Sequence, residues 1–102
     1  MIDVQETPSG IVVNLTQERL DITIANSLLQ NLGDIITKPP KGIILNLRHV
    51  NYMDSAVLGV LVNFQKKIKD AGKTLVVTGL SPAIKKVFQL TKLDKFFKIQ
   101  DV

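Results

Sequence analysis

The chain has 102 residues, of which 45% are hydrophobic and 22% charged, with a formal net charge of +4 and no cysteine. This length predicts a single domain over residues 1–102, and the ordinary composition excludes a disordered chain. No apolar stretch approaches the roughly 20 residues that span a bilayer, no signal-peptide pattern opens the chain, and disulfides are excluded, so we expect a cytoplasmic protein without membrane contact.

The first forty residues predict a hairpin followed by a helix. Polar and apolar residues alternate over residues 2–6, turn-forming residues occupy 7–10, and an apolar run covers 11–15, so two strands joined by a turn are expected. A helix is then predicted between the N-cap candidate Asp21 and Pro39-Pro40, where the prolines end the pattern. Its apolar residues recur at helical spacing: Ala25, Leu28, Leu29, Leu32, Ile35 and Ile36.

A strand, a loop and a second amphipathic helix are predicted for the middle of the chain. Residues 43–47 are nearly all apolar, as in a central strand that is buried on both faces of a sheet. A loop over residues 48–54 follows, and the next helix begins at Asp54 or Ser55 and ends near Gly72. Its inward stripe is predicted to consist of Val57, Val60, Leu61, Phe64 and Ile68.

The last third of the chain predicts another strand and another helix. The strand covers residues 73–79, and the helix has Ser81 as N-cap and Pro82 in its first turn. Its inward residues should be Ile84, Val87 and Phe88. Residues 93–102 are apolar enough to dock on the body, but their pattern defines no element. The fold class is therefore α/β, with a mixed sheet of about four to five strands and helices packed against it.

The residue types that most catalytic and metal sites need are missing. One histidine and no cysteine argue against a zinc site, and we expect no metal and no cofactor. His49 precedes Ser55 by six residues, but the G-x-S-x-G turn of serine hydrolases is absent, so we interpret His49 as a loop residue. The six glycines form neither a dinucleotide-binding pattern nor a P-loop. We therefore predict no catalytic residues and a protein that is not an enzyme.

The charge is divided unevenly along the chain. Residues 1–55 hold four basic and six acidic side chains, net −2, whereas residues 56–102 hold nine lysines and three acidic side chains, net +6. Lysine without arginine and with few aromatic residues is a weak signal for nucleic acid, so we expect no direct DNA or RNA binding. A solvated lysine face is the simplest interpretation. Binding of an acidic ligand, nucleotide or nucleic acid remains an alternative that a steep salt dependence would reveal.

A polar segment between the predicted central strand and the second helix is the best candidate site. α/β sheets place sites where strands pass into helices, and here Asp54-Ser55 occupies that junction. A serine at or beside an N-cap keeps its hydroxyl at the surface, where a phosphate would meet free backbone N–H groups. Asp-Ser before an apolar run is also a routine helix start, so spacing alone leaves both interpretations open.

Three stretches of the sequence resemble the STAS domain family, in particular the bacterial anti-sigma factor antagonists. Residues 53–60 resemble the family's Met-Asp-Ser-Ser-Gly-Leu-Gly-Val motif, with Ala56 and Val57 in place of its second serine and first glycine. Leu20-Asp21 resembles its Gly-x-Leu-Asp, with Glu18 in place of the glycine, and residues 81–88 resemble its Ser-Pro-x-hydrophobic segment. Glu18 could change the turn before the first helix, and Val57 could tighten the rim around Ser55.

The resemblance implies a cycle of partner exchange. An anti-sigma factor that is also a serine kinase binds the unmodified protein, releases its sigma factor, and then phosphorylates the serine, here Ser55, which a serine phosphatase would reset. ATP and Mg²⁺ belong to the kinase. The partner-binding residues that we expect are Asp21, Asp54, Ser55, Ala56, Leu58, Gly59 and Val62, although Val62 could equally belong to the core.

A second hypothesis within the same family is an adaptor that is never phosphorylated. Such a protein would be a stable subunit of a transport, stressosome-like or lipid-trafficking assembly. The replacements at Ala56 and Val57 motivate this hypothesis, and the intact Asp54-Ser55 pair counts against it.

Overall fold

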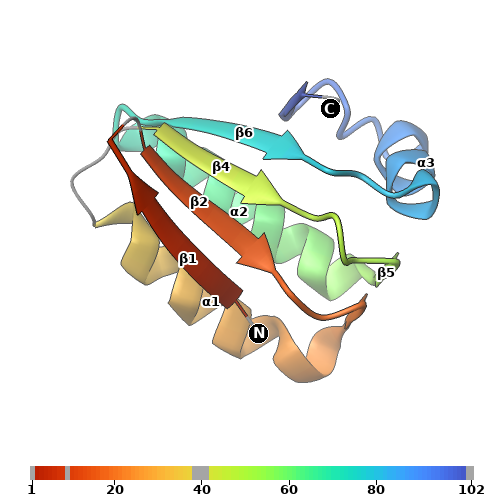
Figure 1. The fold of residues 1–102 in the computed structure, drawn as a ribbon. Helices are drawn as coiled ribbons and strands as arrows, with labels where there is room; N and C mark the ends of the chain where they lie inside the picture. Colours follow the sequence, from red (N-terminus) through yellow and green to blue (C-terminus); the bar gives the residue numbers. More distant parts are fainter. Residues whose placement is uncertain (1, 9, 38–41, 101–102) are drawn as a thin grey trace.

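A five-stranded mixed sheet forms the centre of the structure, a computed structural model that describes residues 2–8, 10–37 and 42–100 (Figure 1). Across the sheet the order is β1 (Ile2–Thr7), β2 (Gly10–Leu15), β4 (Gly42–Asn46), β6 (Thr74–Thr78) and β7 (Lys98–Gln100). β1 pairs antiparallel with β2, and the remaining neighbours are parallel. The α/β fold with a mixed sheet is thereby confirmed. Ser9 of the predicted turn and Pro39-Pro40 lie outside the described residues.

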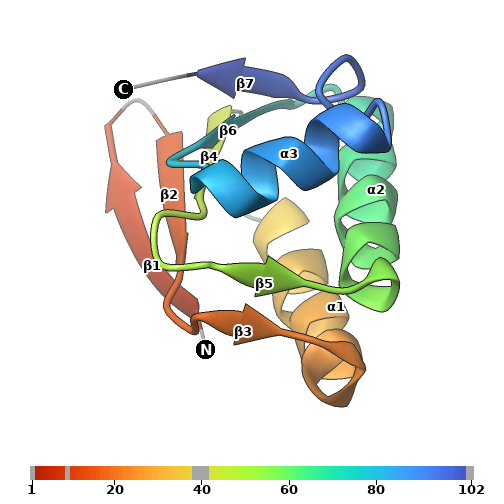
Figure 2. The same cartoon turned by 90° about the vertical axis from the view of Figure 1, so that its right-hand side faces the viewer.

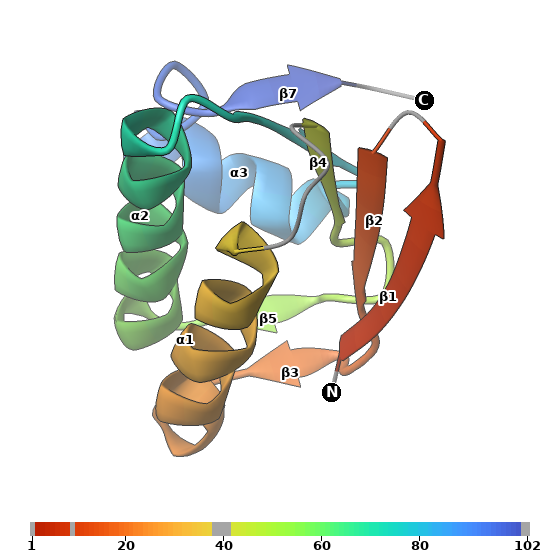
Figure 3. The same cartoon turned by 90° about the vertical axis from the view of Figure 1, so that its left-hand side faces the viewer.

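Two long helices cover one face of this sheet. α1 (Ile22–Ile36) and α2 (Ser55–Asp70) lie side by side on that face, and the opposite face carries no helix within the described parts of the chain (Figure 3). The prediction that the central strand is buried on both faces is therefore wrong. Ile43 and Leu45 of β4 are buried under the helices, whereas Ile44 between them is 38% exposed. No helix in the described residues is both long enough and apolar enough to cross a bilayer.

The core lies between the sheet and the two helices. All five residues predicted for the inward stripe of α2 are buried. From α1, Ala25, Leu28, Leu32 and Ile35 are buried. Burying each large aliphatic side chain is worth roughly 1.5–3 kcal/mol, so these stripes fix α1 and α2 on the sheet.

The predicted helix starts are confirmed by their caps. The side chain of Asp21 accepts from the backbone N–H of Thr23 at 3.0 Å, and that of Ser81 accepts from Ile84 at 3.3 Å at the start of α3 (Pro82–Leu90). α2 starts at Ser55 with Asp54 as its N-cap. Gly72 closes α2 with a φ of 72°, a left-handed conformation that glycine adopts without strain.

A second, two-stranded sheet was not predicted. β3 (Arg19–Leu20) pairs in parallel with β5 (Tyr52–Met53) (Figure 2). β5 lies inside the segment 48–54 that was predicted to be a loop. The Glu18 carbonyl accepts from the N–H groups of Asn51 and Tyr52 at 2.7 and 3.1 Å. Strands of two residues have no periodic pattern, and their pairing joins segments about thirty positions apart, so local sequence could not reveal them.

The end of the described chain docks on the body as a strand. Phe97 is buried, with its ring centroid 5.5 Å from that of Phe88 in α3, and β7 then pairs with β6. Of the inward residues predicted for α3, Ile84 and Phe88 are buried, whereas Val87 is only half-buried because it lies on the flank of the helix.

Candidate protein-interaction site

The β3–β5 ladder determines which side chains reach the surface near Ser55. Leu20 is paired with Met53, and both are buried. Because side chains alternate along a strand, their neighbours Arg19 and Tyr52 point outward, and both are exposed. β3 leads into α1 and β5 leads into α2, so the starts of both helices lie beside this ladder (Figure 2).

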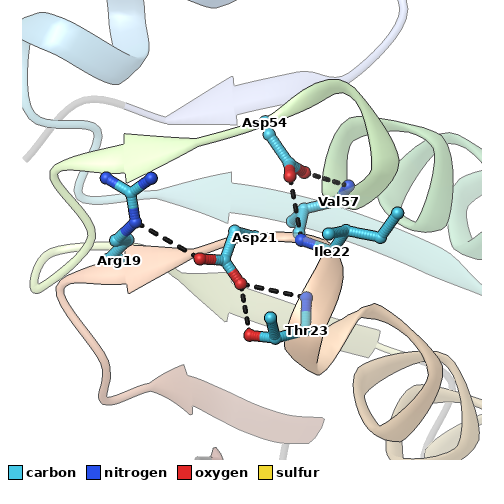
Figure 4. Close-up of polar contacts among 6 residues, drawn as sticks. All are labelled: Arg19, Asp21, Ile22, Thr23, Asp54 and Val57. Carbon is cyan, nitrogen blue, oxygen red and sulfur yellow. Dashed lines mark hydrogen bonds and ion pairs between the residues drawn. The ribbon is translucent and has the colours of Figure 1, made fainter.

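The Asp54 carboxylate holds the starts of two helices together. Its Oδ1 accepts from the backbone N–H of Val57 at 3.0 Å and so caps α2, while its Oδ2 accepts from the backbone N–H of Ile22 at 2.8 Å at the start of α1 (Figure 4). Both N–H groups lack partners within their helices, and a negative charge is favoured at both N-termini. Asp54 therefore fixes the position of Ser55 relative to α1.

Asp21 is the N-cap of α1 and is bonded within its own segment. It accepts from the backbone N–H and the hydroxyl of Thr23, and its Oδ2 lies 3.3 Å from Nε of Arg19 (Figure 4). The hydroxyl and N–H of Thr23 hold the pKa of the Asp21 carboxyl below its ordinary value of 3.8, with a smaller contribution from Arg19. Asp21 is therefore ionised at neutral pH.

Three residues that the sequence analysis missed enlarge this surface. The Arg19 guanidinium lies 4.0 Å from the centroid of the Tyr52 ring. Tyr52 is 42% exposed, and Ile22, directly after the α1 N-cap, is 71% exposed. Only two other large hydrophobic residues of the described chain are exposed, Ile44 and Leu90. An isoleucine outside the inward stripe of α1 was the signal available in the sequence.

Ser55 is exposed, as expected, and its hydroxyl makes no hydrogen bond to any described residue. Gly59 is also exposed, and Asp54, Leu58 and Val62 are half-buried. The half-buried position of Val62 is compatible with both roles expected for it, partner binding and core packing. We call the Ser55 surface the set that comprises Arg19, Asp21, Ile22, Tyr52, Asp54, Ser55, Leu58, Gly59 and Val62.

The two replaced positions of the motif differ in burial, and the expected role of Ala56 in partner binding stays a prediction. Val57 is fully buried, so it cannot tighten the rim around Ser55. Ala56 is half-buried, and helical spacing places it in line with Asn63, which lines the groove between α1 and α2. Glu18 needs no left-handed backbone, because Lys92 is the only non-glycine residue with a positive φ among those described. His49 is an exposed loop residue.

A mixed, mostly parallel sheet with two helices on one face, together with an Asp-Ser pair at the start of the second helix, defines the class of this protein. The model of the STAS domain matches residues 1–102, and the chain belongs to this family.

Within this family, the chain is similar to individual proteins of one kind. The chain is 29% identical over 82 residues to the anti-sigma-B factor antagonist of Staphylococcus aureus, covering 80% of this chain and 76% of that protein. The crystal structure of a candidate anti-sigma factor antagonist from Thermotoga maritima is 29% identical, covers 99% of this chain and 86% of that one, and gives a TM-score of 0.85. The chain is thus similar to anti-sigma factor antagonists in sequence and in structure.

A more distant structure supports the fold alone. The Bacillus cell fate determinant SpoIIAA in its phosphorylated form is 20% identical, covers 100% of this chain and 91% of that one, and gives a TM-score of 0.76.

Proposed function

We propose that this protein is an anti-sigma factor antagonist that binds an anti-sigma factor with serine kinase activity through the Ser55 surface. Binding of the unphosphorylated form releases a sigma factor, and phosphorylation of Ser55 ends the interaction. One observation carries the proposal: the Ser55 hydroxyl is exposed, accepts or donates no hydrogen bond among the described residues, and is held at the first residue of α2 by an aspartate that is hydrogen-bonded to the starts of two helices.

The geometry suits a substrate of a kinase. The hydroxyl is accessible, and its backbone belongs to a capped helix, so it can enter a partner's active site without local unfolding. ATP, Mg²⁺ and the catalytic base would all come from the partner. The protein itself would need no catalytic group.

A phosphate on Ser55 would change the surface strongly and the fold little. It adds about −1.5 to −2 charges next to the carboxylates of Asp54 and Asp21, which would repel a partner that fits the neutral hydroxyl. The free N–H groups at the start of α2 would stabilise the phosphate locally. SpoIIAA has been solved in both states, so this fold accommodates phosphorylation.

The residues around Ser55 also suit a protein interface. Arginine, tyrosine and large aliphatic side chains near the centre of an interface contribute much of its binding energy. Arg19, Tyr52 and Ile22 offer such side chains next to the serine and come from segments that are separate in the sequence.

Phosphoryl transfer and binding can be tested together. The purified protein would be incubated with ATP and each serine-kinase anti-sigma factor of the source genome, and then analysed by intact mass and peptide mapping. We expect one added phosphate on Ser55 and loss of the complex. Ser55→Ala should bind without accepting phosphate, and Ser55→Asp should bind at least tenfold more weakly. A serine phosphatase should restore binding of the phosphorylated wild type.

The unphosphorylated adaptor is the second candidate, and Ala56 favours it because the family motif has a serine there. In that case no kinase would modify Ser55, and Ser55→Asp would leave the cellular complex intact. Either result would replace the first proposal by the second.

A further inference from the structure

The face of α2 that carries Ser55 at its start carries lysines near its end. We propose that the partner bound at the Ser55 surface also presents an acidic surface that pairs with Lys66 and Lys69 of α2. The inference rests on the proposed function and identifies the chemistry of the partner beyond the phosphorylation site.

Helical geometry places one of these lysines in line with the serine. Ser55, Gly59, Val62 and Lys66 are spaced by four, three and four residues, which keeps them on one line along a helix. Gly59 and Lys66 are exposed, and Val62 is half-buried. Eleven residues at 1.5 Å each place Lys66 about 16 Å from Ser55.

Neither lysine at this end of the line forms an ion pair with a described residue, although the exposed Asp70 lies one helical turn after Lys66. The only ion pair among the described residues joins Arg19 and Asp21, so neither Lys66 nor Lys69 has an acidic partner there. The Lys69 ammonium instead lies 5.3 Å from the centroid of the Phe96 ring. Lys69 also borders an open hollow of about 190 Å³, whose described lining includes Lys73 and Lys98 and no acidic residue.

The size of an ordinary interface brings Lys66 to the edge of the contact area, and Lys69 lies three residues further along α2, about 21 Å from Ser55. A stable protein interface covers about 800 Å² on each partner and is therefore roughly 30 Å across. Ser55 lies at one end of α2, and an interface of this size centred on the Ser55 surface reaches along the helix to Lys66. Charged groups at such a rim mainly determine the association rate and the choice of partner.

Lys67 supplies a matched control one residue away. One residue turns about 100° around a helix, and Lys67 lines the narrow groove between α1 and α2 instead of the Ser55 line. Lys66→Glu, Lys69→Glu and Lys67→Glu change the net charge equally. Lys67 and Lys69 both lie in the last turn of α2, so Lys67→Glu also controls for the effect of Lys69→Glu on the helix dipole.

The experiment measures association rates of the full chain with the serine-kinase anti-sigma factor that binds it, at about 50 mM and 500 mM salt. We expect Lys66→Glu and Lys69→Glu to slow association about three- to tenfold at low salt, and Lys67→Glu to remain within about twofold of wild type. The differences should disappear at high salt, because salt then screens the attraction between charges that are more than a few ångströms apart. Thermal unfolding of each variant verifies folding.

Each other outcome overturns a defined part of the argument. If Lys66→Glu and Lys69→Glu associate like the wild type while Ser55→Asp loses binding, the acidic partner surface is wrong and the proposed function stands. If Lys67→Glu is equally slow, the effect is that of net charge alone. If the wild type binds no anti-sigma factor, both proposals are wrong. Binding of RNA or duplex DNA oligonucleotides that Lys66→Glu weakens would assign the lysines to nucleic acid instead.

Discussion

The Asp54 carboxylate lies 2.8 Å from the backbone N–H of Ile22, a residue 32 positions earlier in the chain. The same carboxylate caps α2 through Val57. Asp54 therefore connects the starts of α1 and α2 at the place where Ser55 becomes accessible, and its role in the motif is first of all structural.

Replacing Asp54 should lower the stability of the protein, because both of its hydrogen bonds to helix starts are affected. Asp54→Ala leaves two helix-start N–H groups without protein acceptors and should lower the free energy of unfolding by about 1–3 kcal/mol. Asp54→Asn keeps one carbonyl acceptor and should lose less. Urea unfolding would measure both variants. If Asp54→Ala were as stable as the wild type, the hydrogen bonds of Asp54 to Ile22 and Val57 would contribute nothing to the free energy of unfolding.

Asp21 should make stability depend on pH in the acid range. Its folded pKa lies below 3.8, the value expected when the chain is unfolded, so the folded state binds fewer protons than the unfolded state. The stabilisation is complete well above 3.8 and is lost as the pH falls through the folded pKa. Urea midpoints between about pH 2 and 7 should show the difference between wild type and Asp21→Asn shrinking below about pH 4. A difference that stays constant would contradict this assignment.

Two helical glycines form a matched pair for testing the contact surface. A Cβ added at Gly33 or Gly59 would meet nothing within 4 Å, and neither residue has a positive φ. Alanine at either position should therefore raise the free energy of unfolding by about 0.5–1 kcal/mol. Only Gly59→Ala should weaken partner binding, because only Gly59 belongs to the Ser55 surface. Equal affinities of the two variants would remove Gly59 from the interface.

Ile22 and Tyr52 should contribute to binding more than to stability, because both are exposed. Alanine at either position should weaken binding of the anti-sigma factor about fivefold or more, which corresponds to about 1 kcal/mol. Leu90→Ala is the control, since Leu90 is 74% exposed on α3 and lies outside the Ser55 surface. Calorimetric titration would compare the three. A loss for Leu90→Ala as large as the others would indicate a different binding surface.

Much of the fold could be predicted because its elements have strong local patterns. The stripe of α2 repeats over about three turns, and the caps Asp21, Asp54 and Ser81 combine with apolar runs that local sequence reveals. The run at residues 43–47 was misinterpreted as doubly buried, because an apolar strand on an uncovered sheet face has the same sequence pattern as a central one.

The candidate site also has features that local sequence predicts and features that only the tertiary structure shows. The sequence by itself determined the exposed Ser55 at a capped helix start, because caps and helical periodicity are local properties. Only the tertiary structure decided that Asp54 bonds to Ile22 and that Arg19 lies over Tyr52, since both contacts cross between segments about thirty residues apart. Those contacts depend on the pairing of β3 with β5, which has no signature in either segment alone.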